Sequence, residues 1–176
     1  MTWRPFEALS ATVGLRVDRN IFDAQWITNL TDSSNHYVFG RLDQTTVSMT
    51  TRLNYTLRPT LSLQLYAQPF VSGGAYSNIR ELVDGRNSTY AQRYAPYAYD
   101  AAVNGNPDFN VRSFRTTNVL RWEYKPGSTL FVVWQQARES DDLLDSAFQL
   151  GRDVSGIFSA APKNVFLVKL AYWLNY

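Results

Sequence analysis

Apolar and polar residues alternate at every second position over most of the chain, and this alternation limits the fold more than any other feature. A period of two is that of a β-strand with one apolar face and one polar face. It is clearest at the carboxyl terminus, where one row reads Phe166, Val168, Leu170, Tyr172, Leu174 and Tyr176. The alternation predicts an all-β chain.

The same reading divides the chain into about seven strands within one domain, 1–176. The predicted strands cover 9–17, 22–30, 37–57, 61–71, 109–124, 129–136 and 164–176. The segments 72–108 and 137–163 are predicted to be long loops, and 31–35 an intermediate one. Three connections are short and rich in turn-forming residues: Asp18-Arg19-Asn20, Arg58-Pro59-Thr60 and Lys125-Pro126-Gly127-Ser128.

The connection lengths indicate how the strands are arranged. The short connections follow the first, third and fifth strands, so they all lie at one end, where the last strand also finishes. Barrels of the bacterial outer membrane combine short periplasmic turns with long outer loops. We therefore expect an antiparallel up-and-down meander that forms part of a transmembrane β-barrel in the outer membrane of a Gram-negative envelope, with a periplasmic carboxyl terminus.

A barrel of this kind requires more strands than the prediction supplies. Seven strands that finish in the periplasm must begin outside, whereas a complete barrel normally has an even number of strands. The expectation is that missing upstream strands or another polypeptide in a protein complex close the barrel. The amino-terminal residues 1–7 lack the apolar core of a signal peptide. The chain is accordingly expected to be a fragment, a split-gene product or a processed piece.

Composition excludes several classes of function. The formal net charge is +2 and the cations form no cluster, which argues against binding to nucleic acid. The absence of cysteine excludes disulfides, thiol catalysis and cysteine metal sites. No apolar run reaches the ~18 residues of a membrane helix.

Three groups of residues have predicted roles in the barrel. The terminal row is expected to face outer-membrane lipid and to resemble the signal that the barrel-assembly machinery reads; its members are Phe166, Val168, Leu170, Tyr172, Leu174 and Tyr176. An aromatic girdle at the turn end is predicted from Tyr55, Trp122 and Tyr124, with the core of a soluble sandwich as the alternative. A polar lumen, either a channel lining or an ordinary hydrogen-bonded interior, is predicted from Arg52, Gln64, Gln68, Arg115, Arg121 and Glu123.

Candidates for chemistry are sparse, and each has a structural alternative. His36, the single histidine, could belong to a Ser–His pair of a hydrolase, but it is predicted to be a surface histidine of an outer loop, because no nucleophile or orienting carboxylate is spaced around it in sequence. An acidic group could hold Ca²⁺ or be a solvated loop; its members are Glu139, Asp141, Asp142 and Asp145. Tyrosines in the first long loop could stack on sugars or stabilise the loop itself; they are Tyr76, Tyr90, Tyr94, Tyr97 and Tyr99.

Several stretches resemble one family of bacterial surface proteins. They are Tyr37-Val-Phe-Gly-Arg-Leu-Asp-Gln, Thr51-Arg-Leu-Asn-Tyr-Thr-Leu-Arg-Pro, Leu61-Ser-Leu-Gln-Leu-Tyr-Ala-Gln-Pro-Phe, Leu120-Arg-Trp-Glu-Tyr-Lys-Pro-Gly-Ser-Thr-Leu-Phe and Lys169-Leu-Ala-Tyr-Trp. They are similar to the carboxyl-terminal barrel region of domain-of-unknown-function family 5916. Its members often begin with a carbohydrate-binding family-9-like domain, which this chain lacks. The resemblance implies an outer-membrane barrel and leaves its biochemical role open.

The leading functional hypothesis is a non-enzymatic integral outer-membrane β-barrel segment that serves as an anchor, a pore or a component of a larger envelope assembly. It requires no cofactor. Two alternatives stay open: a soluble β-sandwich carbohydrate-binding module, and a barrel-borne envelope hydrolase.

Overall fold

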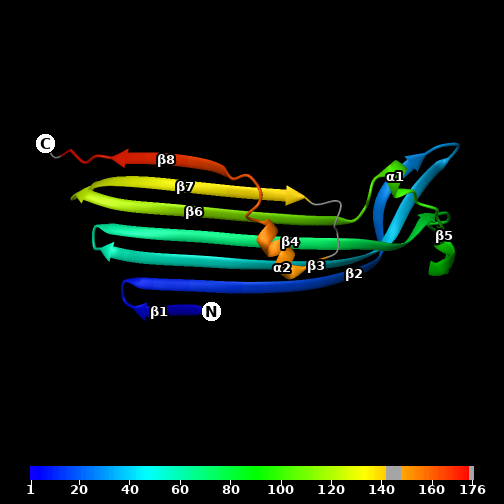
Figure 1. The fold of residues 1–176 in the computed structure, drawn as a ribbon, viewed down its shortest axis with the longest axis horizontal. Helices are drawn as coiled ribbons and strands as arrows, with labels where there is room; N and C mark the ends of the chain where they lie inside the picture. The colour runs from blue at the N-terminus through cyan, green and yellow to red at the C-terminus, as the bar shows by residue number, and fades with distance from the viewer. Residues whose placement is uncertain (142–147, 175–176) are drawn as a thin grey trace.

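One open antiparallel sheet dominates the computed structural model, which describes residues 1–141 and 148–174 (Figure 1). Seven strands follow one another across the sheet in the order β1-β2-β3-β4-β6-β7-β8, and the short β5 pairs with β4. The strands are β1 (Thr2–Phe6), β2 (Leu9–Thr31), β3 (Asn35–Arg58), β4 (Leu61–Leu82), β5 (Tyr94–Pro96), β6 (Phe109–Lys125), β7 (Ser128–Asp141) and β8 (Lys163–Ala171). The predicted antiparallel meander is confirmed.

Helical structure is confined to the connections between strands. The helices are η1 (Tyr90–Arg93), α1 (Ala101–Asn104) and α2 (Leu150–Gly156). In the described part of the chain no helix combines the length and apolar character that crossing a membrane demands. The helix α2 lies across one face of the sheet, in front of β3 and β4 in Figure 1, and contacts β4 and β6.

The two ends of the sheet differ as the connection lengths predict (Figure 1). At one end, here called the turn end, two residues join β1 to β2, β3 to β4 and β6 to β7. At the opposite loop end, β4 connects to β6 through residues 83–108, which contain η1, β5 and α1. The strand β8 finishes at the turn end, where Ala171 pairs with Thr129.

The predicted turn at Asp18-Arg19-Asn20 is wrong. These residues lie inside β2 and pair in unbroken register with β3, with Arg19 opposite Thr45. The Arg19 guanidinium binds the carboxylate of Asp43 through two contacts of 3.0 and 2.6 Å. The two predicted strands 9–17 and 22–30 are therefore one strand, β2. Its charged residues mark the point at which one face of the sheet changes from apolar to polar. A short strand, β1, lies before β2 where none was expected.

Both predicted long loops are shorter than expected. The first begins after Leu82 rather than at Ser72, because Gly73 and Gly74 continue the ladder between β3 and β6. In place of the start of the second, β7 continues from Ala137 to Asp141, since β6 supplies partners as far as Val111. The last strand ends at Ala171, after which the backbone N–H of Trp173 donates to the Ser128 hydroxyl of β7, and the predicted strand position of Tyr176 lies outside the described residues.

Gly74, inside β4, has no space for a side chain. A Cβ atom built on Gly74 would lie 2.5 Å from two ring atoms of Phe109 and 2.9 Å from a methyl carbon of Leu42. Any side chain at this position would therefore displace Phe109, which β6 places opposite Gly74. Gly14 in β2, in contrast, has no atom within 4 Å of the same built position.

We expect Gly74→Ala to lower the free energy of unfolding by about 1–3 kcal/mol, because a well-packed site must rearrange to accept the methyl group. Urea unfolding followed by tryptophan fluorescence measures the change. Gly14→Ala is the matched control, with a change within about 0.5 kcal/mol. Equal destabilisation by the two substitutions would contradict the close contact with Phe109.

Candidate functional site

The most extensive surface feature is an apolar belt on one face of the sheet, next to the turn end. Strand register places alternate residues of neighbouring strands side by side: Leu15 lies opposite Met49, and Val47 lies opposite Val71. The belt consists of Leu9, Ala11, Val13, Leu15, Val17, Val47, Met49, Thr51, Leu53, Tyr55, Leu61, Leu63, Leu65, Ala67, Pro69, Val71, Phe114, Thr116, Asn118, Leu120, Trp122, Leu130, Val132, Trp134, Phe166, Val168 and Leu170. None of these side chains is charged.

Much of the belt is in contact with solvent. Leu15 is 69% exposed, Phe166 67% and Val168 71%. A continuous exposed apolar surface is uncommon on soluble monomers and is typical of surfaces that contact lipid or another protein.

The belt ends sharply along the strands. From Val47 toward the loop end, the next residues on the same face of β3 are Thr45, Asp43 and Arg41. The opposite face changes from polar to apolar over the same stretch, because Leu42 lies there between its partners Phe22 and Tyr76. The two faces of the sheet therefore exchange polarity at about Val47.

The opposite face is mainly polar on β3, β4 and β6, whereas on β7 and β8 it carries the apolar residues Phe131, Val133, Val165 and Leu167. It carries all six residues predicted to line a lumen, which are Arg52, Gln64, Gln68, Arg115, Arg121 and Glu123. Several of them are partnered: Arg115 binds Glu139 at 2.8 Å and Arg121 binds Glu123 at 3.3 Å. The contact with Arg115 engages Glu139, a member of the acidic group considered for Ca²⁺.

Metal binding finds no support in the described residues. Within residues 1–141 and 148–174, no three histidine, aspartate or glutamate side chains come together as a metal site would require. Asp142 and Asp145 of the predicted acidic group lie outside the described residues.

Aromatic rings gather at the turn end of the belt. Trp122 and Tyr124 form an edge-to-face pair with ring centroids 6.1 Å apart, and Tyr55 forms another with Phe6 at 6.3 Å. The Tyr124 hydroxyl donates to the carbonyl of Ala171 at the end of β8. The three predicted girdle residues therefore share one end of the sheet, next to the predicted terminal row.

The terminal row is divided between β8 and the residues that follow it. Phe166, Val168 and Leu170 lie on the belt face, where Phe166 stacks on Trp134 with centroids 6.0 Å apart. Tyr172 and Leu174 follow the strand and are 56% and 62% exposed.

A buried ion pair holds α2 against the loop-end margin of the belt. The carboxylate of Asp153 is fully buried and lies 3.2 Å from the guanidinium of Arg112 in β6. It also accepts from the Arg152 side chain and from the backbone N–H of Gln149, each at 2.8 Å. Arg112 occupies the belt face next to Phe114, so α2 covers a charge that would otherwise interrupt the apolar surface.

The loop tyrosines contact the protein itself. The Arg80 guanidinium lies 4.3 Å from the ring centroid of Tyr94, and the Tyr90 hydroxyl donates to Asp23 at 2.8 Å. The ring of Tyr97 lies 5.1 Å from that of His36. These contacts favour the structural reading of the tyrosines over sugar stacking.

His36 has a richer environment than the sequence indicated. Its Nδ1 lies 2.5 Å from a carboxylate oxygen of Glu81, and its Nε2 lies 3.1 Å from the Ser34 hydroxyl and 3.2 Å from Asp32. The hydrogen bond that His36 donates to Glu81 raises the pKa of His36, and Asp32 acts in the same direction. Sequence reasoning missed Glu81 because it lies 45 residues away, at the end of β4.

The fold and its surfaces define a class: an antiparallel β-meander with an uncharged apolar belt on one face and an opposite face that is mainly polar on β3, β4 and β6. A family model for a domain of unknown function, DUF5916, matches residues 2–176. The chain therefore belongs to this family. Comparison with curated proteins and with solved structures found no match for it.

Loss of the Asp153 charge should release α2 from the sheet. Breaking a buried pair by removing one partner costs about 3–5 kcal/mol. Asp153→Asn is therefore expected to make Arg152 a preferred site of trypsin cleavage, detected by mass spectrometry of the fragments. Glu7→Gln, an exposed carboxylate at the turn end, is the control and should leave the cleavage rate unchanged. Unchanged cleavage in both variants would refute the anchoring role.

The His36 cluster should make the loop end depend on pH. Because the folded-state pKa is raised, the stabilisation is complete below the unfolded value of ~6.5 and is lost as pH rises through the folded value. Since His36 is the single histidine, its ring resonance reports the titration directly. We expect a midpoint above 6.5 in the NMR titration, and a downward shift in Glu81→Gln. A midpoint unaffected by Glu81→Gln would contradict the contact.

Proposed function

We propose that this chain is a non-enzymatic segment of an outer-membrane β-barrel, serving as an anchor, a pore or a component of a larger envelope assembly. The observation that carries the proposal is the apolar belt. In β3 it runs from Tyr55 to Val47 and in β4 from Leu61 to Val71, which is nine and eleven residues. A membrane-spanning β-strand needs about 9–11 residues.

Three further features agree with the membrane reading. Polar side chains predominate on the part of the opposite face that β3, β4 and β6 form, as on the lumen side of other barrels of this kind. Aromatic rings lie at the turn end of the belt, where an interfacial girdle would be. The turns at that end have two residues each, which suits a periplasmic side and a periplasmic carboxyl terminus.

The strands continue well past the belt toward the loop end. The 24 residues of β3 span about 80 Å at ~3.3 Å per residue, more than twice the thickness of the hydrocarbon core. On this outer extension the belt face carries Arg19, Asp43 and Arg41, which suits exposure to water. The other face carries Phe22, Leu42 and Tyr76, which suits a dry interior above the membrane.

Barrel closure calls for additional partners. In the described part of the chain β1 has a neighbour on one side only, β2, and β8 likewise has only β7. Unpaired backbone groups in lipid cost several kcal/mol each. We propose that strands upstream in a longer protein or another polypeptide pair with β1 and β8, and that the barrel-assembly machinery inserts the product.

A membrane-insertion assay with two adjacent substitutions tests the proposal. Leu65→Arg places a charge at mid-belt, where it costs about 2–4 kcal/mol in lipid. Gln64→Arg places the same charge on the polar face next to it. We expect Leu65→Arg to reduce the urea-resistant membrane fraction in a Gram-negative host and Gln64→Arg to leave it unchanged. A soluble wild-type chain would contradict the proposal and favour the sandwich alternative.

Orientation can be measured separately, because the chain has no cysteine. Ser88→Cys at the loop end is expected to react with a membrane-impermeant maleimide on intact cells. Thr60→Cys at the turn end is expected to react only after the outer membrane is permeabilised. The opposite pattern would reverse the proposed orientation.

The hydrolase alternative now has one specific observation in its favour. Ser34, His36 and Glu81 are arranged in the order of a serine–histidine–acid triad. Asp32, however, binds the same Nε2 as Ser34, and the raised pKa of His36 favours the imidazolium, which cannot act as a base. Hydrolysis of a nitrophenyl ester that is lost in Ser34→Ala would support this alternative; equal background rates would dismiss it.

A further inference from the structure

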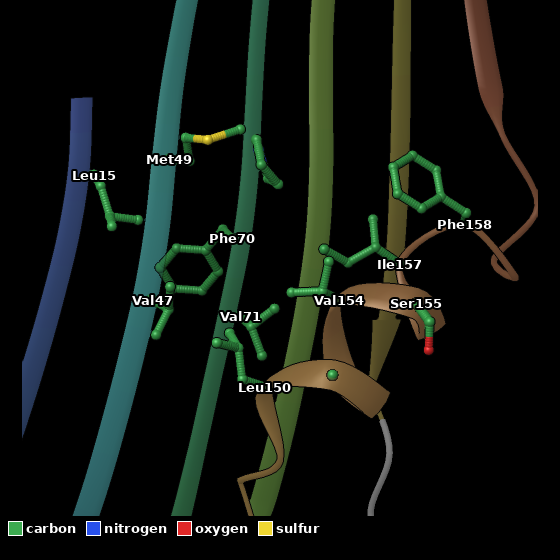
Figure 2. Close-up of a pocket in the computed structure, with 12 residues that line it drawn as sticks. Leu15, Val47, Met49, Phe70, Val71, Leu150, Val154, Ser155, Ile157 and Phe158 are labelled. Carbon is green, nitrogen blue, oxygen red and sulfur yellow. The ribbon is translucent and has the colours of Figure 1, made fainter. Parts of the chain in front are cut away.

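A cavity of about 570 Å³ lies between α2 and the belt (Figure 2). The α2 segment contributes Leu150, Val154, Ile157 and Phe158 on one side, and Leu15, Val47 and Met49 of β2 and β3 lie on the other (Figure 2). The volume falls within the ~300–1,000 Å³ of sites that bind small molecules. We call this cavity the apolar chamber.

The apolar chamber suits a hydrocarbon ligand and little else. Apart from the Ser155 hydroxyl, which donates to the backbone carbonyl of Arg152, its side chains are apolar. The helix roofs the chamber only in part, since Leu150 is 51% exposed and Phe158 is 56% exposed. A polar or charged molecule placed here would lose hydration without gaining a hydrogen bond.

A second chamber of about 290 Å³, whose lining combines charged residues with Ala75 and Phe148, adjoins the first along the same face. Its lining includes Thr45 and Gly73, each two residues beyond a belt residue of its own strand, Val47 and Val71. Charged groups lie at its far side: Arg19 binds Asp43, and Arg41 also lies near enough to lower the pKa of that carboxyl. Arg41 also lies near Asp23, which binds Arg80, so that three guanidinium groups face two carboxylates and leave an excess positive charge.

We infer that the two chambers together bind one phosphate-bearing acyl lipid of the membrane. The acyl chain occupies the apolar chamber beneath α2, and the phosphate lies against Arg19 and Arg41. This inference rests on the proposed membrane location, which places the loop-end margin of the belt at the level of lipid headgroups. It goes further in assigning one retained lipid to a defined position.

The geometry disfavours other occupants. A second copy of the chain would present a flat sheet face, which is too broad to enter a chamber roofed by a helix. A neutral hydrocarbon would fill the apolar chamber but would leave the excess positive charge beside it uncompensated. An acyl chain with an anionic headgroup matches both chambers and their order along the strands.

Native mass spectrometry of the full chain released from detergent micelles tests the inference, with dimyristoyl phosphatidylglycerol as the probe. Val154→Trp fills the apolar chamber. Leu170→Trp adds the same ring on the same face but away from the chamber, where Leu170 is 65% exposed. We expect one bound lipid on the wild type and on Leu170→Trp, and roughly tenfold weaker binding to Val154→Trp.

A charge variant tests the headgroup site without altering α2. Arg41→Glu should weaken binding of dimyristoyl phosphatidylglycerol and leave binding of dimyristoylglycerol, which lacks the phosphate, unchanged. Lys125→Glu, the same change at the turn end, should affect neither ligand. Equal loss for both ligands in Arg41→Glu would argue for an effect on folding and would overturn the headgroup assignment.

Two outcomes separate this inference from the proposed function. If the wild type inserts into membranes but Val154→Trp and Leu170→Trp bind the lipid equally, the lipid site is wrong and the membrane role stands. If the wild type does not insert, the proposed function fails. The comparison of the two tryptophan variants in micelles then decides the lipid site independently.

Discussion

Strand register is the constraint on which the rest of this structure depends. Successive side chains of a strand point to opposite faces, so a slip of one residue would transfer a whole row to the wrong side. Long ladders hold the register: β2 and β3 pair from Leu9–Tyr55 to Thr31–Asn35, with two irregularities toward the loop end. Because each ladder keeps its phase along the belt, apolar rows from neighbouring strands join into one surface.

The exchange of polarity between the faces links the fold to its proposed environment. Near the turn end the belt face is apolar, and the opposite face carries the polar residues predicted to line a lumen, as lipid requires. Toward the loop end the belt face carries the charged Asp43 and the opposite face carries the apolar Leu42, as in a water-soluble protein. Arg112 and Arg138 are exceptions at the boundary: Asp153 of α2 binds Arg112, and the carbonyls of Phe158 and Ala160 accept from Arg138. The same helix creates the apolar chamber, so anchoring of the helix and formation of the cavity have one cause.

Much of the fold could be predicted from sequence because a period of two needs no tertiary information. The meander, the shared polar face of Arg52 and Arg121, and the common end of the short turns all follow from it. The predicted turn at Asp18-Arg19-Asn20 was wrong because a charged stretch looks the same in a turn and on a wet strand face. Only the partner strand, which supplies Asp43, separates the two cases.

By itself, the sequence determined the strand class, the two-faced pattern and the asymmetry of the connections, since these depend on local periodicity and on turn-forming residues. Tertiary structure alone decided where the belt ends, how Glu81 reaches His36 and where α2 docks. These features join residues that are distant in the chain: the Arg112–Asp153 contact spans 41 positions. Their positions depend on ladder register and on the path of a long connection, and neither leaves a periodic trace in the sequence.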